Sequence, residues 1–237
     1  MNPVPPTPPP APLHCRPEAF DTLARSLEAV DTTRGLVRCA VAVSMHQHPD
    51  ADADAVEREL QRLSQTIADR TQSDHPPALL AHAHAVLFDE AGFAGNTDDY
   101  YHPDNSYLHR VLDTKRGLPI TLTLVYKAVL EPLGLRVRGV NAPGHFLAAV
   151  HDRDHGPPTL IDPFHGGKLL TREEAFTRIE TVAGGAVVRD DALLPPARHD
   201  TWLVRLIQNL VGSFDRLGRR DDMAALNELK ALARSIG

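Results

Sequence analysis

The segment PITLTLVYKAVLEPLG, residues 119–134, limits the possible folds more than any other part of the chain. Its apolar side chains recur on nearly every face and leave no wide polar side. A helix of this kind is stable only where other elements cover it all round. Pro119 suits the first helical position, because an N–H at that position would have no partner within the helix. We therefore expect a helix that begins at Pro119 and lies in the centre of the fold.

After Gly134 the apolar residues change to a period of two, which is typical of strands. Three short segments follow this pattern, and they read LRVRGV, FLAAVH and TLID. The segments are joined by the turns NAPG and HDRDHGPP. Short connections of this kind join antiparallel neighbours. The sequence therefore predicts an antiparallel meander packed on the buried helix.

Helical patterns surround this expected core. From Phe20 to about Glu90 the apolar residues recur at spacings of three and four. Thr171 and Glu174 have the spacing of a capping box and predict a short helix after the meander. Two C-terminal segments, TWLVRLIQNLVGSFDRL and DDMAALNELKALARSI, are separated at Gly218 and predict a helical hairpin.

Composition narrows the class of protein. The chain has 237 residues, and its 25 Lys and Arg against 31 Asp and Glu give a net charge of −6, so it has no basic field for nucleic acid. No run of eighteen apolar residues and no signal-peptide pattern is present, which predicts a cytoplasmic protein without membrane association. Only Cys15 and Cys39 occur, so neither a disulfide framework nor a thiolate metal site is expected.

These patterns together predict an α+β fold with four parts. Residues 1–19, which begin MNPVPPTPPPAP, are expected to form a disordered proline-rich tail. Residues 20–95 are expected to form an N-terminal helical subdomain. The core with the buried helix and the small antiparallel sheet is assigned to residues 96–185. The helical hairpin is assigned to residues 200–237.

A histidine and an aspartate on neighbouring predicted strands suggest a catalytic arrangement. His145 precedes an apolar strand in VNAPGHFLAAV, and Asp162 ends the next strand in LIDPFHGG, seventeen residues later. In papain-like and transglutaminase-like cysteine enzymes, a thiol at a helix N-terminus is followed by such a pair. The imidazole then acts as general base and the carboxylate fixes its tautomer.

Longer motifs carry a family resemblance. GFAGNTDDYYHPDNSYLHRVLDTKRGLPITLTLVY, LGLRVRGVNAPGHFLAAV and IDPFHGG resemble the SirB family of bacterial invasion-gene regulators. The resemblance runs from roughly Val37 to Gly167 and, more weakly, through RLIQNLVGSFDRLG to the end. It implies a transglutaminase-like core of papain type, followed by tetratricopeptide-like helices, and a cytoplasmic location. It implies no known substrate, and the C-terminal part has room for only about one helical hairpin.

The resemblance also indicates that the nucleophile is missing. By comparison with active transglutaminases, the thiol would stand at Pro119, and the RG-x-PI motif of the SirB family has proline there too. His145 and Asp162 are then a vestigial pair, or simply a buried histidine with a hydrogen-bonded partner. Asp162 can also be read as a turn opener before proline. Thr121, in the first helical turn, is the alternative nucleophile.

No metal and no cofactor are expected. His102, His145, Asp162 and His165 are candidate ligands by residue type. None of them has the HExxH or CxxC spacing that places two ligands on one face. Surface histidines explain the count of 13 more simply.

The loop FAGNTDDYYHPDNSY is dense in Asn, Asp, Gly and Tyr and allows two interpretations. As structure, it is a long connection whose Asp104, Asn105 and Ser106 supply N-cap oxygens to the helix YLHRVLDTKR, which Gly117 ends. As function, it forms one wall of a cleft whose other wall is APGH and PFHGG. The residues expected to line this cleft are Asn96, Tyr100, Tyr101, Asn105, Ser106, Pro119, Gly144, Phe164, His165 and Gly166.

The sequence thus predicts a non-catalytic protein that binds a peptide, a small ligand or a protein partner and acts in regulation. The alternative is an amide-acting hydrolase or transferase that uses His145 and Asp162 with a nucleophile such as Thr121. A third hypothesis is an interaction scaffold, in which residues 200–237 bind a partner and can be deleted without unfolding the core.

Overall fold

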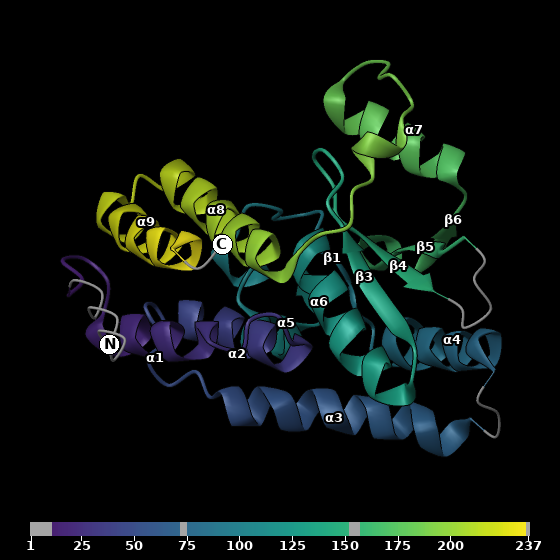
Figure 1. Ribbon diagram of the computed structural model, residues 1–237, viewed down its shortest axis with the longest axis horizontal. Helices are drawn as coiled ribbons and strands as arrows, with labels where there is room; N and C mark the ends of the chain where they lie inside the picture. The colour runs from purple at the N-terminus through teal and green to yellow at the C-terminus, as the bar shows by residue number, and fades with distance from the viewer. Residues whose placement is uncertain (1–10, 72–74, 152–156, 236–237) are drawn as a thin grey trace, which may run out of the picture.

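The computed structural model describes residues 11–71, 75–151 and 157–235. The first ten residues of the expected tail, and residues 152–156 of the expected turn HDRDHGPP, lie outside the described residues. The fold is α+β and mostly helical, with one small antiparallel sheet (Figure 1). Among the described residues, no helix combines the length and the apolar character needed to span a membrane.

Helices make up most of the described chain. The α-helices are α1 (Pro17–Leu27), α2 (Thr33–Ser44), α3 (Ala53–Arg70), α4 (Pro76–His84), α5 (Leu108–Thr114), α6 (Pro119–Leu130), α7 (Arg172–Ala183), α8 (His199–Arg216) and α9 (Arg220–Arg234). A π-helical segment, η1 (Ala85–Glu90), continues α4, and 3₁₀ turns lie at η2 (Pro103–Asn105), η3 (Glu131–Leu133), η4 (Pro163–His165) and η5 (Asp191–Leu193).

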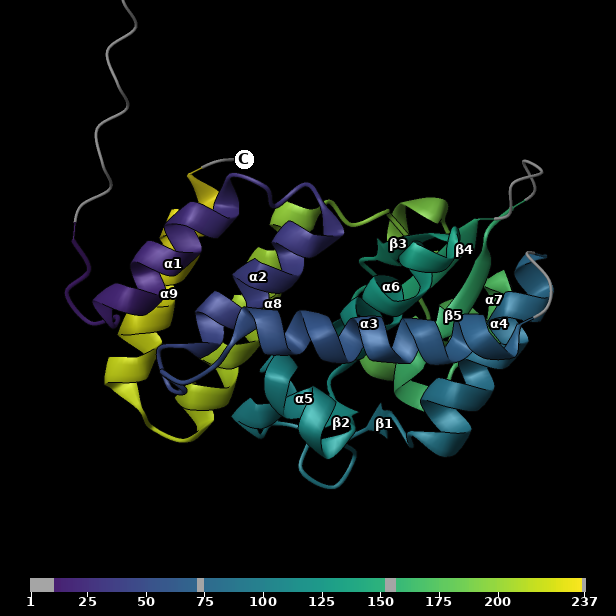
Figure 2. The same cartoon turned by 90° about the horizontal axis from the view of Figure 1, so that it is seen from below.

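The predicted central helix is α6. Every one of its residues except Ala128 is buried. Its one charged side chain is paired, because the Lys127 ammonium lies 2.6 Å from both a Glu131 carboxylate oxygen and the Val137 carbonyl oxygen. The helix packs on the first strands of the sheet on one side, and α2, α3 and α5 contact it elsewhere (Figures 1 and 2). Its apolar pattern is thereby explained.

The sheet is a meander of four antiparallel strands in sequence order. Its strands are β3 (Arg136–Val140), β4 (Leu147–His151), β5 (Thr159–Asp162) and β6 (Lys168–Leu170). The three predicted strands are present, and β6 was not predicted. It has three residues, two of them exposed, which is too short for an alternating pattern to be visible. Two short segments, β1 (Ala94–Gly95) and β2 (Arg116–Gly117), pair with each other in parallel, outside this sheet.

The C-terminal hairpin packs on the rest of the molecule. Helices α8 and α9 are joined at Gly218, which has a φ of +68°, and they lie beside α2 and α1 (Figure 2). Trp202 of α8 is fully buried between Phe146 and Gly139. A stripe of α8 residues is buried with it, namely Leu203, Leu206, Ile207, Leu210, Val211 and Phe214. This burial favours a role for the hairpin in covering the core.

Two predicted boundaries differ from the structure. Helix α1 begins at Pro17, whereas the tail was expected to reach residue 19. The chain is already fixed before it, because the Glu228 carboxylate accepts the backbone N–H groups of Leu13, His14 and Cys15. A contact across more than 200 residues cannot be read from local composition.

Helix α5 also differs from its prediction at both ends. It ends at Thr114, where Lys115 adopts a left-handed conformation with φ of +60°, and the expected terminator Gly117 pairs in β2. Its N-cap is Tyr107, without a side-chain hydrogen bond. The expected cap residues Asp104, Asn105 and Ser106 precede it and do not cap it, because the chain makes the 3₁₀ turn η2 first.

Acid is expected to destabilise the fold through His109. Burial lowers the pKa of His109 to about 4, with help from His48 and Arg110, and its Nδ1 has no hydrogen-bond partner within the described residues. The unfolded chain therefore binds a proton more readily than the folded one. The contribution of neutral His109 to the free energy of unfolding is fully present above about pH 6.5 and decreases as the pH is lowered toward 4.

The substitution His109→Gln tests this directly. We expect it to reduce the loss of unfolding free energy between pH 7.5 and 5 by about 1 kcal/mol, a small value because solvent screens the partly exposed ring. Burial also lowers the pKa values of His46, His84 and His199, so part of the loss remains. Urea unfolding followed by circular dichroism measures both proteins. An unchanged pH dependence would show that His109 does not contribute.

Candidate functional site

The sheet brings His145 and Asp162 to one edge. The pairing of Ala148 with Ile161 places the start of β4 beside the end of β5. His145 lies two residues before the start of β4, and Asp162 is the last residue of β5. Gly144, with φ of +68°, provides the turn that directs the chain into His145.

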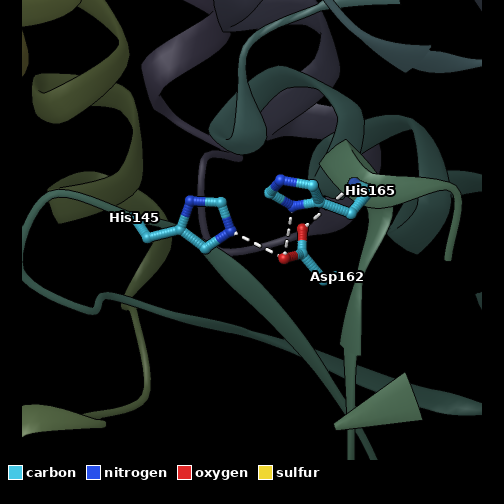
Figure 3. Close-up of side chains that lie close together, drawn as sticks. All are labelled: His145, Asp162 and His165. Atoms are coloured by element: carbon cyan, nitrogen blue, oxygen red, sulfur yellow. Dashed lines mark hydrogen bonds and ion pairs between the residues drawn. The ribbon is translucent and has the colours of Figure 1, made fainter. Parts of the chain in front are cut away.

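The two side chains are in direct contact. His145 Nε2 lies 3.0 Å from Asp162 Oδ2, and His165 Nδ1 lies 2.8 Å from the same oxygen. The two imidazole rings flank the Asp162 carboxylate (Figure 3). Asp162 is fully buried and His145 nearly so, while His165 is partly exposed. The carboxylate also accepts the backbone N–H of His165 at 3.3 Å and so caps η4.

These contacts determine where the protons lie. Burial alone would raise the pKa of Asp162, but hydrogen bonds from His145 and His165 outweigh it, and the pKa lies below its usual value. An ionised carboxylate only accepts hydrogen bonds, so His145 donates from Nε2. In the neutral imidazole the basic lone pair is then on Nδ1. The arrangement is that of an oriented general base.

Arg178 of α7 completes the cluster and was not predicted. Its Nη1 lies 3.3 Å from His165 Nε2, and its Nε lies 3.6 Å from Asp162 Oδ2. A guanidinium only donates, so His165 Nε2 accepts and His165 carries its proton on Nδ1. Nothing local in TREEAFTRIE distinguishes this arginine from a solvent-exposed one. Its position depends on how α7 packs beside β6.

Arg205 of α8 holds the turn that carries His145, and it also was not predicted. Its guanidinium donates to the carbonyl oxygens of Ala142 and His145, each at 3.0 Å, and to the Asn141 side chain. Burial lowers the pKa of Arg205. Its only sequence signal is its place one turn after Trp202, beside the buried stripe of α8. The C-terminal hairpin therefore positions the site.

An open pocket of about 480 Å³ lies beside the pair. Its lining residues are Tyr100, Tyr101, Pro119, Gly144, His145, Phe164, His165, Arg178, Thr181 and Val182. Six of the residues expected to line the cleft are in this set, which are Tyr100, Tyr101, Pro119, Gly144, Phe164 and His165. Arg178, Thr181 and Val182 add a wall from α7 that was not predicted.

The other four residues expected in the cleft lie outside its lining, and that part of the prediction is corrected. Asn105 is buried and donates to the carbonyl oxygens of Asp99 and Tyr100, and Asn96 donates to Asn105 at 2.9 Å. Ser106 is fully buried. Gly166, with φ of +66°, ends η4. Asn96 and Asn105 thus hold the loop, and the two tyrosines of that loop reach the pocket.

The candidate nucleophiles do not line this pocket. Thr121 is fully buried, and its hydroxyl has no hydrogen-bond partner among the described residues. Cys15 and Cys39 are the chain's two cysteines, and burial raises the pKa of each thiol to about 12. Pro119, at the start of α6, does line the pocket beside His145. The place expected for a thiol is therefore occupied by a side chain without nucleophilic character.

His145, Asp162 and His165 could also hold a metal ion, since one ligand atom from each lies within 4.8 Å of the others. The fourth ligand considered, His102, instead accepts the backbone N–H of Asp104. A metal would need lone pairs on the two nitrogens whose protons Asp162 accepts. His165 would then carry its proton on Nε2, facing the donor Arg178. The contacts favour hydrogen bonding over coordination.

Comparison with known proteins assigns the chain to a family. A family model described as "Transglutaminase-like superfamily" matches residues 54–208, which run from the second residue of α3 into the middle of α8 and include the whole site. The chain belongs to this superfamily. The matched residues therefore include, in this order, the helix that begins at Pro119, the strand that follows His145 and the strand that ends at Asp162. No solved structure matches the chain.

Relatives of this transglutaminase-like protein include bacterial and animal proteins. A "UPF0162 protein" of Xylella fastidiosa (strain 9a5c) is 35% identical over 207 residues, which are 85% of this chain and 73% of the relative. A "UPF0162 protein" of Vibrio cholerae is 24% identical over 136 residues, 55% of this chain and 48% of the relative. "F-box only protein 21" of Mus musculus is 34% identical over 142 residues, 57% of this chain but 21% of that protein.

Proposed function

We propose that this chain is a SirB-type, non-catalytic transglutaminase-like protein that binds a peptide in the pocket beside His145 and acts in regulation. One observation carries the proposal. The oriented pair of His145 and Asp162 opens on a pocket of about 480 Å³, while Pro119 occupies the helix start where a nucleophile would be needed. A general base without a group to deprotonate gives no covalent catalysis.

The shape and chemistry of the pocket support a peptide as the ligand. Apolar and aromatic side chains form much of the wall, with a few polar groups at fixed positions, as is typical of ligand sites. Tyr101 is exposed at 52% and stacks under the Arg216 guanidinium, 3.8 Å from the ring centroid, so its ring is held in place at the surface. Rigid aromatic rings provide contact area at low entropic cost.

Nuclear magnetic resonance with a pool of short N-acetylated peptides tests the proposal. We expect saturable shifts of the amide signals of Gly144, His165 and Thr181, and no change in the peptides by mass spectrometry. Thr181→Trp, which places a large ring at the exposed rim, should abolish the shifts. Thr177→Trp, one turn earlier on α7 and outside the pocket lining, is the matched control and should keep them.

Two results would contradict the proposal. One is hydrolysis of the peptides, or their cross-linking to an added primary amine, that is lost in His145→Ala. This would favour an amide-acting enzyme. The other is a set of shifts that Thr181→Trp leaves unchanged, which would place binding outside the pocket.

A further inference from the structure

The charges around the pocket are of one sign. Arg178 is the one fully charged residue among those that line it, and His145 and His165 can only add positive charge. Asp162 is fully buried behind the two imidazole rings and is already hydrogen-bonded to both. The pocket therefore presents donors and a cation to a ligand, in a chain whose net charge is −6.

Arg178 has donors left for a ligand. Its contacts to Asp162 and His165 use Nε and Nη1. The planar guanidinium carries five N–H groups, and the two on Nη2 form no hydrogen bond or ion pair within the described residues. The side chain is 31% exposed, so a ligand can reach it. Its contacts with Asp162 and His165 hold the fork in place, which reduces the entropy lost on binding.

The remainder of the pocket is apolar beside this cation. Pro119, Phe164 and Val182 lie on the walls, and the ring of Tyr100 packs edge-on against Phe164 with centroids 5.9 Å apart. A ligand that satisfies both features has a carboxylate next to an apolar side chain. Arginine binds carboxylates through two parallel hydrogen bonds, which are about twice as strong as neutral ones.

We propose that the pocket binds a peptide through a carboxylate, which Arg178 holds, with a neighbouring apolar side chain against Phe164 and Val182. This inference rests on the proposed function and specifies its ligand. The carboxylate can come from the C-terminus of a peptide or from an acidic side chain, and both present the same group.

The test compares the affinities of three peptides, measured by titration followed with nuclear magnetic resonance. They are N-acetyl-Ala-Ala-Leu with a free carboxylate, the same peptide with a terminal amide, and N-acetyl-Ala-Glu-Leu with a terminal amide. We expect the free carboxylate to bind at least about tenfold more tightly than the first amide, as one charge-assisted hydrogen bond implies. Binding of the third peptide would identify an acidic side chain as a second source of the carboxylate.

Two variants and a change in salt concentration test whether Arg178 causes the tighter binding of the carboxylate peptide. Arg178→Gln should remove the difference between the carboxylate and the amide, whereas Arg172→Gln, the same change of charge on the same helix, should keep it. Added sodium chloride should weaken the wild-type affinity for any peptide that binds through a carboxylate and leave the affinity for N-acetyl-Ala-Ala-Leu amide unchanged, and this result stands even if Arg178→Gln fails to fold. If the carboxylate peptide and its amide bind with equal affinity, and Thr181→Trp abolishes the binding of both, the carboxylate inference is overturned. The proposal of a peptide-binding pocket is then retained. No shift of pocket signals with any peptide would overturn both.

Discussion

Replacing Pro119 with cysteine is expected to create a thiol that reacts with iodoacetamide about tenfold faster at pH 7 than the same thiol in a protein that also carries His145→Ala. Position 119 is the first residue of α6, where the helix dipole favours a thiolate. It lines the same pocket as His145, whose Nδ1 holds the basic lone pair. The helix start and the imidazole should thus together lower the pKa of the new thiol.

The native chain suits this measurement. Burial raises the pKa of Cys15 and of Cys39 to about 12, so background labelling at pH 7 should be slow. Thr181→Cys, in the lining of the same pocket and near the C-terminal end of α7, is the matched control for exposure and should react at an ordinary rate. Mass spectrometry of digested protein gives the rate at each site. Equal rates for Pro119→Cys with and without His145 would show that the imidazole does not face position 119.

This experiment also distinguishes a lost active site from a histidine with a purely structural role. A vestigial pair retains the geometry in which a thiol was activated, so restoring the sulfur restores its reactivity. A structural histidine has no reason to present Nδ1 to the start of α6. The contact of Asp162 with Nε2, which leaves Nδ1 free of this carboxylate, is required by the first alternative and is only compatible with the second.

The sequence predicted those features that depend on neighbouring residues. The helix from Pro119, the capping box of Thr171 and Glu174, and the hairpin at Gly218 each follow from spacing within one or two turns, and the structure contains all three. His145 and Asp162 could be paired because short connections force β4 and β5 to be neighbours. In each case the physical cause lies within the segment itself.

The features that the sequence did not predict depend on contacts between distant segments. Arg178 reaches Asp162 only because α7 folds back over the sheet, and Arg205 reaches the turn before β4 from 60 residues away. Arginines on amphipathic helices are usually solvated, so their type and spacing gave no reason to select these two. The asparagines of the loop were assigned to the cleft because their backbone partners, Asp99 and Tyr100, could not be foreseen.

Trp202→Ala is expected to lower the free energy of unfolding by about 3–5 kcal/mol. The indole is fully buried, its ring centroid lies 4.6 Å from that of Phe146, and its N–H donates to the Ile120 carbonyl oxygen at 3.3 Å. The backbone of Gly139 approaches it so closely that a Cβ there would lie 2.4 Å from the ring. Truncation leaves a large cavity between α6, α8 and the sheet, and it leaves the Ile120 carbonyl without this donor.

The same substitution tests the interpretation of the C-terminal hairpin. Urea unfolding of Trp202→Ala is compared with that of Leu217→Ala, which removes a side chain of α8's C-cap that is 57% exposed and should change stability by less than about 0.5 kcal/mol. A large loss at Trp202 alone means that α8 belongs to the core, so a protein lacking residues 200–237 could not keep a folded core or a positioned His145. A small loss at both positions would instead favour the scaffold hypothesis, because the hairpin could then be removed without exposing the centre of the fold. The close contacts of Trp202 with α6 and β3 favour the first result.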